Sequence, residues 1–366
     1  MTPTRELIQI GRNLLTICVL GGLLAGCSVI GPSAIRSGRL EYNEAISLTD
    51  NQQLLLEIVN NRYEERGSLL AVASVTANVR VTASTGVELG FGDQDNYSGN
   101  LTPFGAGAVY EENPTISYVP VQGEKYSRRL FSPLPVSVFA QLAGTLFNPD
   151  NIYTSLVSNV NGIRNPDFLF ATNDADPRFE RFVAIMTVLT RAQRLFWFED
   201  PQQAGSLSVV IDHYAPAYTA EVHEMLELLG LPAPDDHAEQ VILPVFLALD
   251  ARDHGGIGLI TRSVFDLMQI LSAAVEVSEE DLRRGIAASY PPVGLAGKKL
   301  RISRSKSKPE NAIVAVKHRN DWFYIDETDQ FTKQFFRLMA TLWSVSIAES
   351  APKGHGSPVL TVPVSR

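Results

Sequence analysis

Histidines, acidic clusters and glycine runs are the residues from which a catalytic or metal site would be built. The six histidines are scattered, and none has a spacing such as His-x₃-His or His-Glu-x-x-His. Asp235-Asp236-His237 is too short a cluster to supply a metal's ligands. Gly255-Gly256-Ile257-Gly258 fits no phosphate-loop pattern, and no serine lies in Gly-x-Ser-x-Gly. The sequence therefore predicts no enzyme and no cofactor, although distant residues can still assemble a site.

Cys27 stands in a more specific setting, at the end of the string Leu24-Ala25-Gly26-Cys27. Arg5 and Arg12 precede an apolar stretch over 14–24. That stretch has about eleven residues, whereas a membrane-spanning helix needs roughly 20. A basic start, a short apolar core and small residues at its end are typical of a secretory signal peptide.

The same string resembles the lipobox of bacterial prolipoproteins. The resemblance implies that signal peptidase II recognises Leu24, Ala25 and Gly26 and cuts before Cys27. It also implies a thioether-linked diacylglycerol and a further acyl chain, such as palmitate, on Cys27. Two or more acyl chains hold a protein stably on a membrane. The alternatives are a secretory peptide with a chance cysteine and an N-terminal membrane helix.

The residue after the cysteine and the overall charge bear on location and partners. Ser28 stands where an Asp retains enterobacterial lipoproteins at the inner membrane, so the resemblance implies the periplasmic face of the outer membrane in a Gram-negative bacterium. The chain has 31 Lys and Arg against 40 Asp and Glu, a net charge of −9. This balance argues against nucleic-acid binding and against attraction to anionic lipid headgroups. The expected partners are the membrane, through the lipid anchor, and envelope proteins or further copies of the chain.

The most unusual pattern is a strict alternation of apolar and polar residues over 75–91. It predicts either one long strand or a hairpin that turns at Ser84-Thr85-Gly86. A further strand is expected at Thr115–Val119. Two interpretations stay open: an antiparallel sheet packed by one face, or a hairpin over 75–119 that enters the membrane.

Helix signals recur through the chain. We expect a helix near 40–46, a second with an N-cap at Ser47-Leu48-Thr49-Asp50, and one over 152–160 that ends at Asn161-Gly162. The longest helix begins at Asp176-Pro177, and its inward residues include Phe196. The segment Pro120–Pro135 reads as irregular.

Strand signals dominate the second half. Alternating strands and helices are expected from Ser206 to Ala274, and the clearest hairpin joins 312–318 to 321–326 through Arg319-Asn320. Residues 298–307 are rich in Lys and Arg, which predicts an edge strand protected by charge. A docking strip for an acidic partner or for peptidoglycan is the alternative.

These signals predict an α+β fold with a mixed or antiparallel sheet and packed amphipathic helices, after a cleaved signal peptide. Five parts are expected: a signal peptide (1–26), a lipidated tether (27–39), a helical hairpin with the long β segment (40–165), a mixed subdomain (166–350) and a tail with a closing strand (351–366). The subdomains 40–165 and 166–350 are expected to share one core. The strings NPTISYVPVQGEKYSRRL and AVKHRNDWFYIDETDQFTKQFF resemble an uncharacterised family of Gram-negative lipoproteins. That resemblance implies a family and no mechanism.

The leading functional hypothesis is a membrane-anchored periplasmic lipoprotein with a structural or interaction role in an envelope assembly, without catalysis. A second is an oligomeric outer-membrane pore whose subunits each donate the hairpin 75–119. A third is a periplasmic carbohydrate-binding or hydrolytic protein, which requires a deep pocket with converging polar groups.

Overall fold

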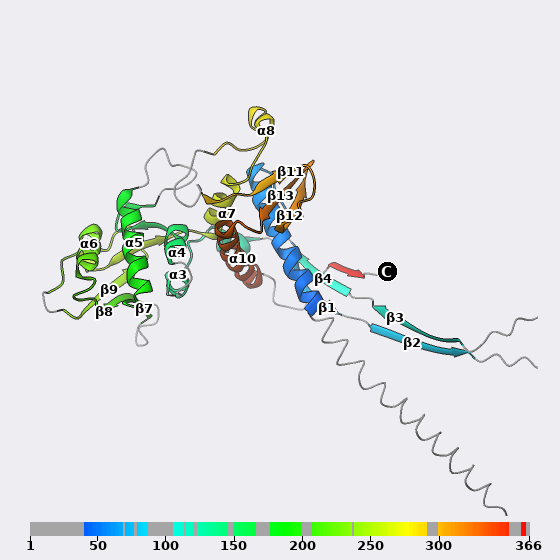
Figure 1. The fold of residues 1–366 in the computed structure, drawn as a ribbon, viewed down its shortest axis with the longest axis horizontal. Coiled ribbons are helices and arrows are strands. Elements are labelled where there is room, and N and C mark those ends of the chain that lie inside the picture. The colour runs from blue at the N-terminus through cyan, green and yellow to red at the C-terminus, as the bar shows by residue number, and fades with distance from the viewer. Residues whose placement is uncertain are drawn as a thin grey trace, which may run out of the picture. The chain divides into compact units, whose positions relative to one another are not determined.

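The computed structural model describes residues 40–68, 70–76, 79–86, 105–112, 115–120, 123–144, 149–165, 176–199, 206–235, 238–290, 299–350 and 360–363. The chain divides into two compact units, Met1–Leu54 and Leu55–Arg366. Within the second unit, helices and mainly antiparallel strands confirm the predicted α+β fold (Figure 1). The lipobox at 24–27 and the tether lie outside the described residues.

The largest sheet has six strands in the order β6-β5-β10-β9-β8-β7. The strands are β5 (Val157–Val160), β6 (Ile163–Arg164), β7 (Leu195–Glu199), β8 (Leu207–Asp212), β9 (Gln240–Phe246) and β10 (Ile257–Thr261). Only β9 and β10 pair in parallel among them. Because β5 and β6 precede residue 166 and the others follow it, this sheet takes strands from both sides of the expected boundary.

Helices cover one face of this sheet. They are α3 (Val136–Ala143), α4 (Pro149–Leu156), α5 (Pro177–Arg191) and α6 (Thr219–Leu229), the last of which packs on α5. The Trp197 indole of β7 donates a 3.2 Å hydrogen bond to Tyr153 of α4 and meets the Phe139 ring of α3 edge-on. As predicted, α5 starts at Asp176-Pro177, where the Asp176 carboxylate accepts from the Arg178 N–H at 3.0 Å.

A second group of elements surrounds α7 (Val264–Ala273), which is buried along most of its length. Around it lie the end of a helix over 40–62, α2 (Glu124–Phe131), α10 (Gln330–Ser350) and the sheet β11 (Ser303–Ser305), β13 (Asp321–Asp326), β12 (Ala312–His318). The Tyr63 hydroxyl, just after the helix over 40–62, donates a 3.3 Å hydrogen bond to Asp281 of α8 (Glu279–Arg283). The predicted hairpin through Arg319-Asn320 is confirmed, with His318 opposite Asp321. The basic segment does supply an edge strand, but only over Ser303–Ser305.

The alternating segment forms part of a long antiparallel ribbon. β1 (Leu70–Thr76) pairs with β4 (Thr115–Pro120), and β2 (Val79–Gly86) pairs with β3 (Gly105–Glu112). The register continues from one pair to the next, since Thr76 faces Thr115 and Val79 faces Glu112. Of the two alternatives for this segment, the hairpin turn at 84–86 is wrong, because those residues belong to β2 and pair with β3. The closing strand is confirmed as β14 (Leu360–Pro363), which pairs with β4.

Three further expectations are corrected by the structure. Residues 40–62 form one helix instead of two, because the Thr49 hydroxyl bonds to the carbonyls of Ala45 and Ile46 inside the helix and caps nothing. The stretch expected to be irregular contains α2, which begins after Gly123 and buries Leu130. The helix expected over 152–160 ends at Leu156, and the β-branched Val157 and Val160 continue as β5.

Candidate interaction surface

The second face of the six-stranded sheet carries apolar residues that no helix of the described residues covers. Strand register places them in rows: Phe196 of β7 lies opposite Val210 of β8, which lies opposite Ile242 of β9. Because paired residues project to the same side, these three side chains form one continuous row.

Burial distinguishes the two faces residue by residue. In β8 the residues Leu207, Val209 and Ile211 are buried, while the residues between them are only half-buried. In β9 the residues that alternate with the buried ones, Ile242 and Phe246, are 59% and 39% exposed. An antiparallel sheet packed on one face normally shows polar residues on the other, so this open apolar face departs from the usual pattern.

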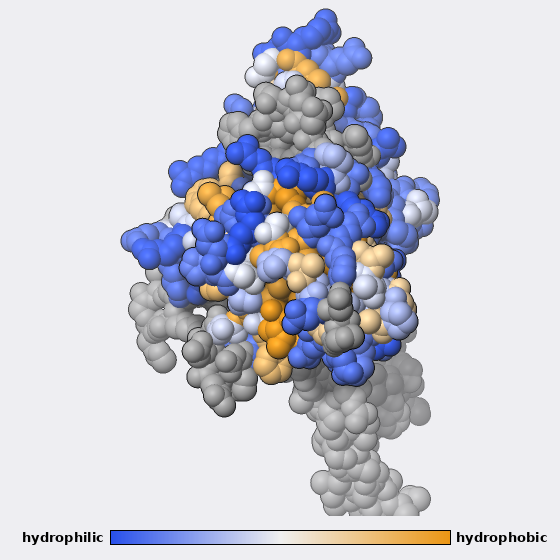
Figure 2. Space-filling model, turned by 90° about the vertical axis from the view of Figure 1, so that its left-hand side faces the viewer, coloured by the Kyte–Doolittle hydropathy of each residue, from blue (hydrophilic) through white to orange (hydrophobic). Residues whose placement is uncertain are grey.

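The edge strand β7 adds two phenylalanines to this face. Phe196 and Phe198 are 48% and 55% exposed, whereas Leu195 between the sheet and the helices is buried. We define the open apolar face as Phe196, Phe198, Val210, Ile242 and Phe246. Figure 2 shows hydrophobic surface among hydrophilic residues on the side of the molecule where α6, β8 and β9 lie.

The exposed area can be compared with known interfaces. A buried aromatic side chain contributes about 150–250 Å², so the four most exposed members offer on the order of 400 Å². The largest apolar patch of a typical monomer is about 300–600 Å² and is often functional. Each partner in a standard protein–protein interface buries about 800 Å². The open apolar face is therefore large enough to anchor a weak interface.

Sequence reasoning missed this surface because it extended the preceding helix to Phe196 and turned that side chain inward. The structure ends α5 at Arg191 and reverses the chain at Gln193, which has a positive φ of 55°. The run Leu195-Phe196-Trp197-Phe198 is rich in aromatic residues, a composition typical of strands. That composition was the available signal.

The four histidines that the structure describes do not form a site together. His213 lies 2.8 Å from Asp212, and His254 contacts the Phe246 ring. His237 and His355 lie outside the described residues, as do Asp236 and the lipobox residues Leu24, Ala25, Gly26 and Cys27. In the part of the chain that the structure describes, no group of three His, Cys, Asp or Glu side chains is placed to hold a metal.

Among the described histidines, His318 lies in a dense polar cluster. Its buried ring bonds through Nε2 to Glu65 at 2.8 Å, and Arg319 contacts the other carboxylate oxygen at 2.5 Å. Arg319 and then His318 hold the pKa of Glu65 below its ordinary value. Because the His318 ring also packs on Tyr63 and Phe323, this cluster ties the β12–β13 turn to the end of the helix over 40–62 and serves structure.

The carboxyl of Asp321, in the same hairpin, makes the stability of the fold depend on pH. Burial alone would raise the pKa of its carboxyl, but Lys306 at 2.7 Å and Arg304 at 2.8 Å outweigh burial and hold the pKa below its usual value. The ionised form therefore stabilises the fold above about pH 4, and this stabilisation is lost as pH falls through the lowered pKa.

We expect Asp321→Asn to lower the free energy of unfolding by about 2 kcal/mol at pH 7. The deficit should shrink as pH falls below about 4 and through the lowered pKa of Asp321, because the wild-type carboxyl then becomes protonated as well. Urea unfolding at a series of pH values measures both. A deficit that stays constant down to pH 2 would show that Asp321 acts through packing and not through its charge.

Two further findings complete the description. No helix among the described residues combines the length and the apolar character needed to cross a membrane. Comparison of the chain with protein families, with curated proteins and with solved structures gave no match.

Proposed function

We propose that this chain is a lipid-anchored protein of the Gram-negative envelope that self-associates on the outer membrane and works as a structural subunit. The observation that carries the self-association is the open apolar face of β7, β8 and β9. The anchor rests on the resemblance of Leu24-Ala25-Gly26-Cys27 to a lipobox. The proposed function is binding between copies of the chain, without catalysis.

A second copy of the chain fits the open apolar face better than an oppositely charged partner does. The row Phe196–Val210–Ile242 contains no charge, so two copies can bring these faces together without opposing like charges, although each chain carries −9 overall. Interfaces within homodimers are also the more apolar class. A twofold axis needs only one self-complementary patch.

The small size of the face is compensated by anchoring. An interface of about 400 Å² per copy is weak in free solution. Acyl chains hold both copies on one surface, which raises their effective concentration as a linker does. We therefore expect association on the membrane and little or none after the anchor is removed.

Cysteine crosslinking in intact outer membranes tests this proposal. The mature chain is expected to carry no free thiol, since Cys18 leaves with the leader and Cys27 is alkylated. We expect Ile242→Cys to crosslink into dimers with a short bis-maleimide. Ser307→Cys, exposed in the loop after β11, is the matched control and should stay monomeric. Crosslinking of the parent chain itself would reveal a free Cys27 thiol and overturn the anchor.

Charge on the open apolar face should abolish the crosslink. Phe196→Glu in the Ile242→Cys background is expected to lower the dimer yield at least tenfold, because a carboxylate would be desolvated between two apolar faces. Val345→Glu on α10 changes a side chain of similar exposure outside the face and should leave the yield unchanged. Equal yields in both variants would refute the self-association.

The long ribbon supports a second candidate function, the membrane-inserting hairpin. The pair β2–β3 continues the register that β1–β4 has from Ser74 onward, and a two-stranded sheet such as β2–β3 is only marginally stable alone. A partner for β2 and β3 is therefore expected, either lipid or further copies. Labelling of Thr82→Cys by a water-soluble maleimide in intact membranes tests the insertion. Protection of the cysteine favours insertion of the hairpin, and full labelling excludes it.

A further inference from the structure

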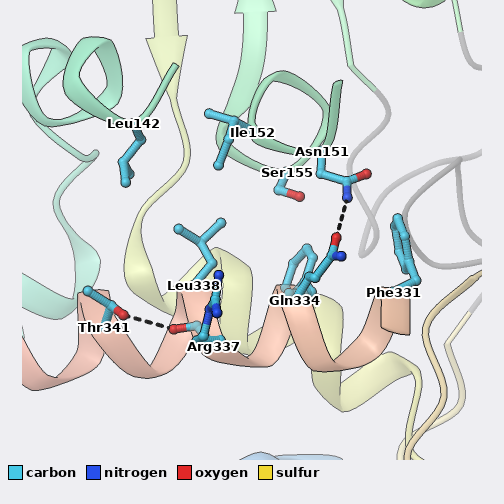
Figure 3. A pocket seen from close by; sticks show the side chains of 10 residues that line it. Leu142, Asn151, Ile152, Ser155, Phe331, Gln334, Arg337, Leu338 and Thr341 are labelled. Carbon is cyan, nitrogen blue, oxygen red and sulfur yellow. Dashed lines mark hydrogen bonds between the residues drawn. The ribbon is translucent and has the colours of Figure 1, made fainter. Parts of the chain in front are cut away.

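A pocket of about 160 Å³ lies between α10 on one side and α3 and α4 on the other (Figure 3). Leu142 of α3, Ile152 of α4 and Leu338 of α10 point toward the space between the helices. Phe331 and Phe335 extend the apolar wall along α10. The interior is therefore shaped by branched aliphatic and aromatic side chains from three helices.

Apart from Ser155, the polar side chains of this pocket lie at one end and at the exposed rim. The Asn151 amide donates a 3.2 Å hydrogen bond to the Gln334 side chain and joins α4 to α10 at one end (Figure 3). Arg337 and Thr341 lie at the exposed rim. Arg337 is the one charged residue among the described residues that line the pocket, and the described side chains of the inner wall are neutral.

Ser155 is the exception on the inner wall. The residue is 1% exposed and lines the pocket on the side of α4 that faces α10. Its carbonyl accepts a hydrogen bond from Arg262 at 2.9 Å, and its side chain lines the pocket. A serine hydroxyl both donates and accepts hydrogen bonds, and here it lines a space that a ligand can fill.

We propose that this pocket binds a small, uncharged aromatic molecule that carries one hydrogen-bonding group, with Ser155 as its polar contact. An apolar cavity of about 150 Å³ accommodates one benzene molecule, so the volume fits a single six-membered ring. A hydroxyl on that ring would hydrogen-bond to the Ser155 hydroxyl. The site is separate from the open apolar face and does not depend on self-association.

Phenol and toluene form a matched pair of probes, because they differ only in a hydroxyl and a methyl of similar size. Saturation-transfer NMR on the full chain in detergent measures the binding of each. We expect phenol to bind with a Kd on the order of 1 mM. Ser155→Ala should weaken phenol binding by about 3–10-fold, the value of one neutral hydrogen bond, and leave toluene binding unchanged.

A second variant shows where the probes bind, and it distinguishes binding in the pocket from partition of phenol and toluene into the detergent micelle. Leu338→Trp fills the pocket and should abolish the signal of both probes, whereas Val345→Trp adds the same side chain at an exposed position of α10 and should abolish neither. Thermal melting of each variant establishes that it is folded.

Three results would overturn the proposal. Phenol binding that is unchanged in Ser155→Ala removes the polar contact. Signals that persist in folded Leu338→Trp place the binding elsewhere. Toluene binding without phenol binding shows a purely apolar ligand site.

Discussion

Replacing Asn161 by alanine is expected to lower the free energy of unfolding by about 4 kcal/mol, a large part of the roughly 5–15 kcal/mol that stabilises a typical domain. The side chain is 5% exposed and bonds to four backbone groups. Its amide donates to the carbonyls of Leu229 and Gly256, both at 3.1 Å. Its carbonyl oxygen accepts from the N–H groups of Ala251 at 3.3 Å and Gly258 at 2.6 Å.

The size of this effect follows from the backbone groups that lose their hydrogen-bond partner in Asn161→Ala. Four buried backbone groups, in α6 and around β10, lose their partner together, and each buried unsatisfied group costs about 1–3 kcal/mol before water partly compensates. Asn161 also has a positive φ of 44°, a conformation that Asn tolerates better than Ala. Urea unfolding followed by fluorescence of the three tryptophans measures the loss.

Two comparison variants identify the cause. Asn159 is also buried, but its side chain accepts a single 3.0 Å bond from the Gly162 N–H, so Asn159→Ala should cost only about 1 kcal/mol. Asn161→Asp keeps the acceptor but turns a carboxylate toward two carbonyl oxygens. Its pKa should be raised, so this variant should regain stability as pH falls toward 4. Equal losses for Asn161→Ala and Asn159→Ala would contradict the four-bond network.

Local signals in the sequence predicted the elements whose ends are marked by side chains. Asp176-Pro177 starts α5, and Arg319-Asn320 turns the β12–β13 hairpin, with Arg319 at a positive φ of 53°. Each of these signals acts within a few residues, through a cap, a missing N–H or a positive φ. Such interactions can be recognised without knowledge of the tertiary structure.

The errors arose where tertiary contacts decide the conformation. Val157–Val160 fits a helical stripe, yet β10 offers a neighbouring strand and takes these residues into the sheet. Phe196 fits the inward stripe of α5, yet the turn at Gln193 places it in β7. The open apolar face and the Ser155 pocket each join residues more than 40 positions apart in the sequence, so neither can be seen from local spacing.

The glycines of Gly255-Gly256-Ile257-Gly258 lead to the second large prediction, because the structure explains them by packing and not by phosphate binding. We expect Gly256→Ala to lower the free energy of unfolding by about 3 kcal/mol or more. A Cβ at Gly256 would overlap the Pro244 carbonyl oxygen and lie 2.8 Å from the Phe246 ring, both in β9. Backbone cannot yield as a flexible side chain does, so β9 and β10 would have to separate.

The neighbouring glycine is the matched control, since it is required for a different reason. Gly255 has a positive φ of 64° and nothing within 4 Å of a Cβ. Gly255→Ala should therefore cost about 1–2 kcal/mol through backbone strain alone, and Gly255→Asn less, because Asn visits this conformation routinely. Gly256→Asn should instead be at least as damaging as Gly256→Ala. If Asn restores stability at both positions, backbone conformation and not close packing governs this turn, and the account of β9 against β10 fails.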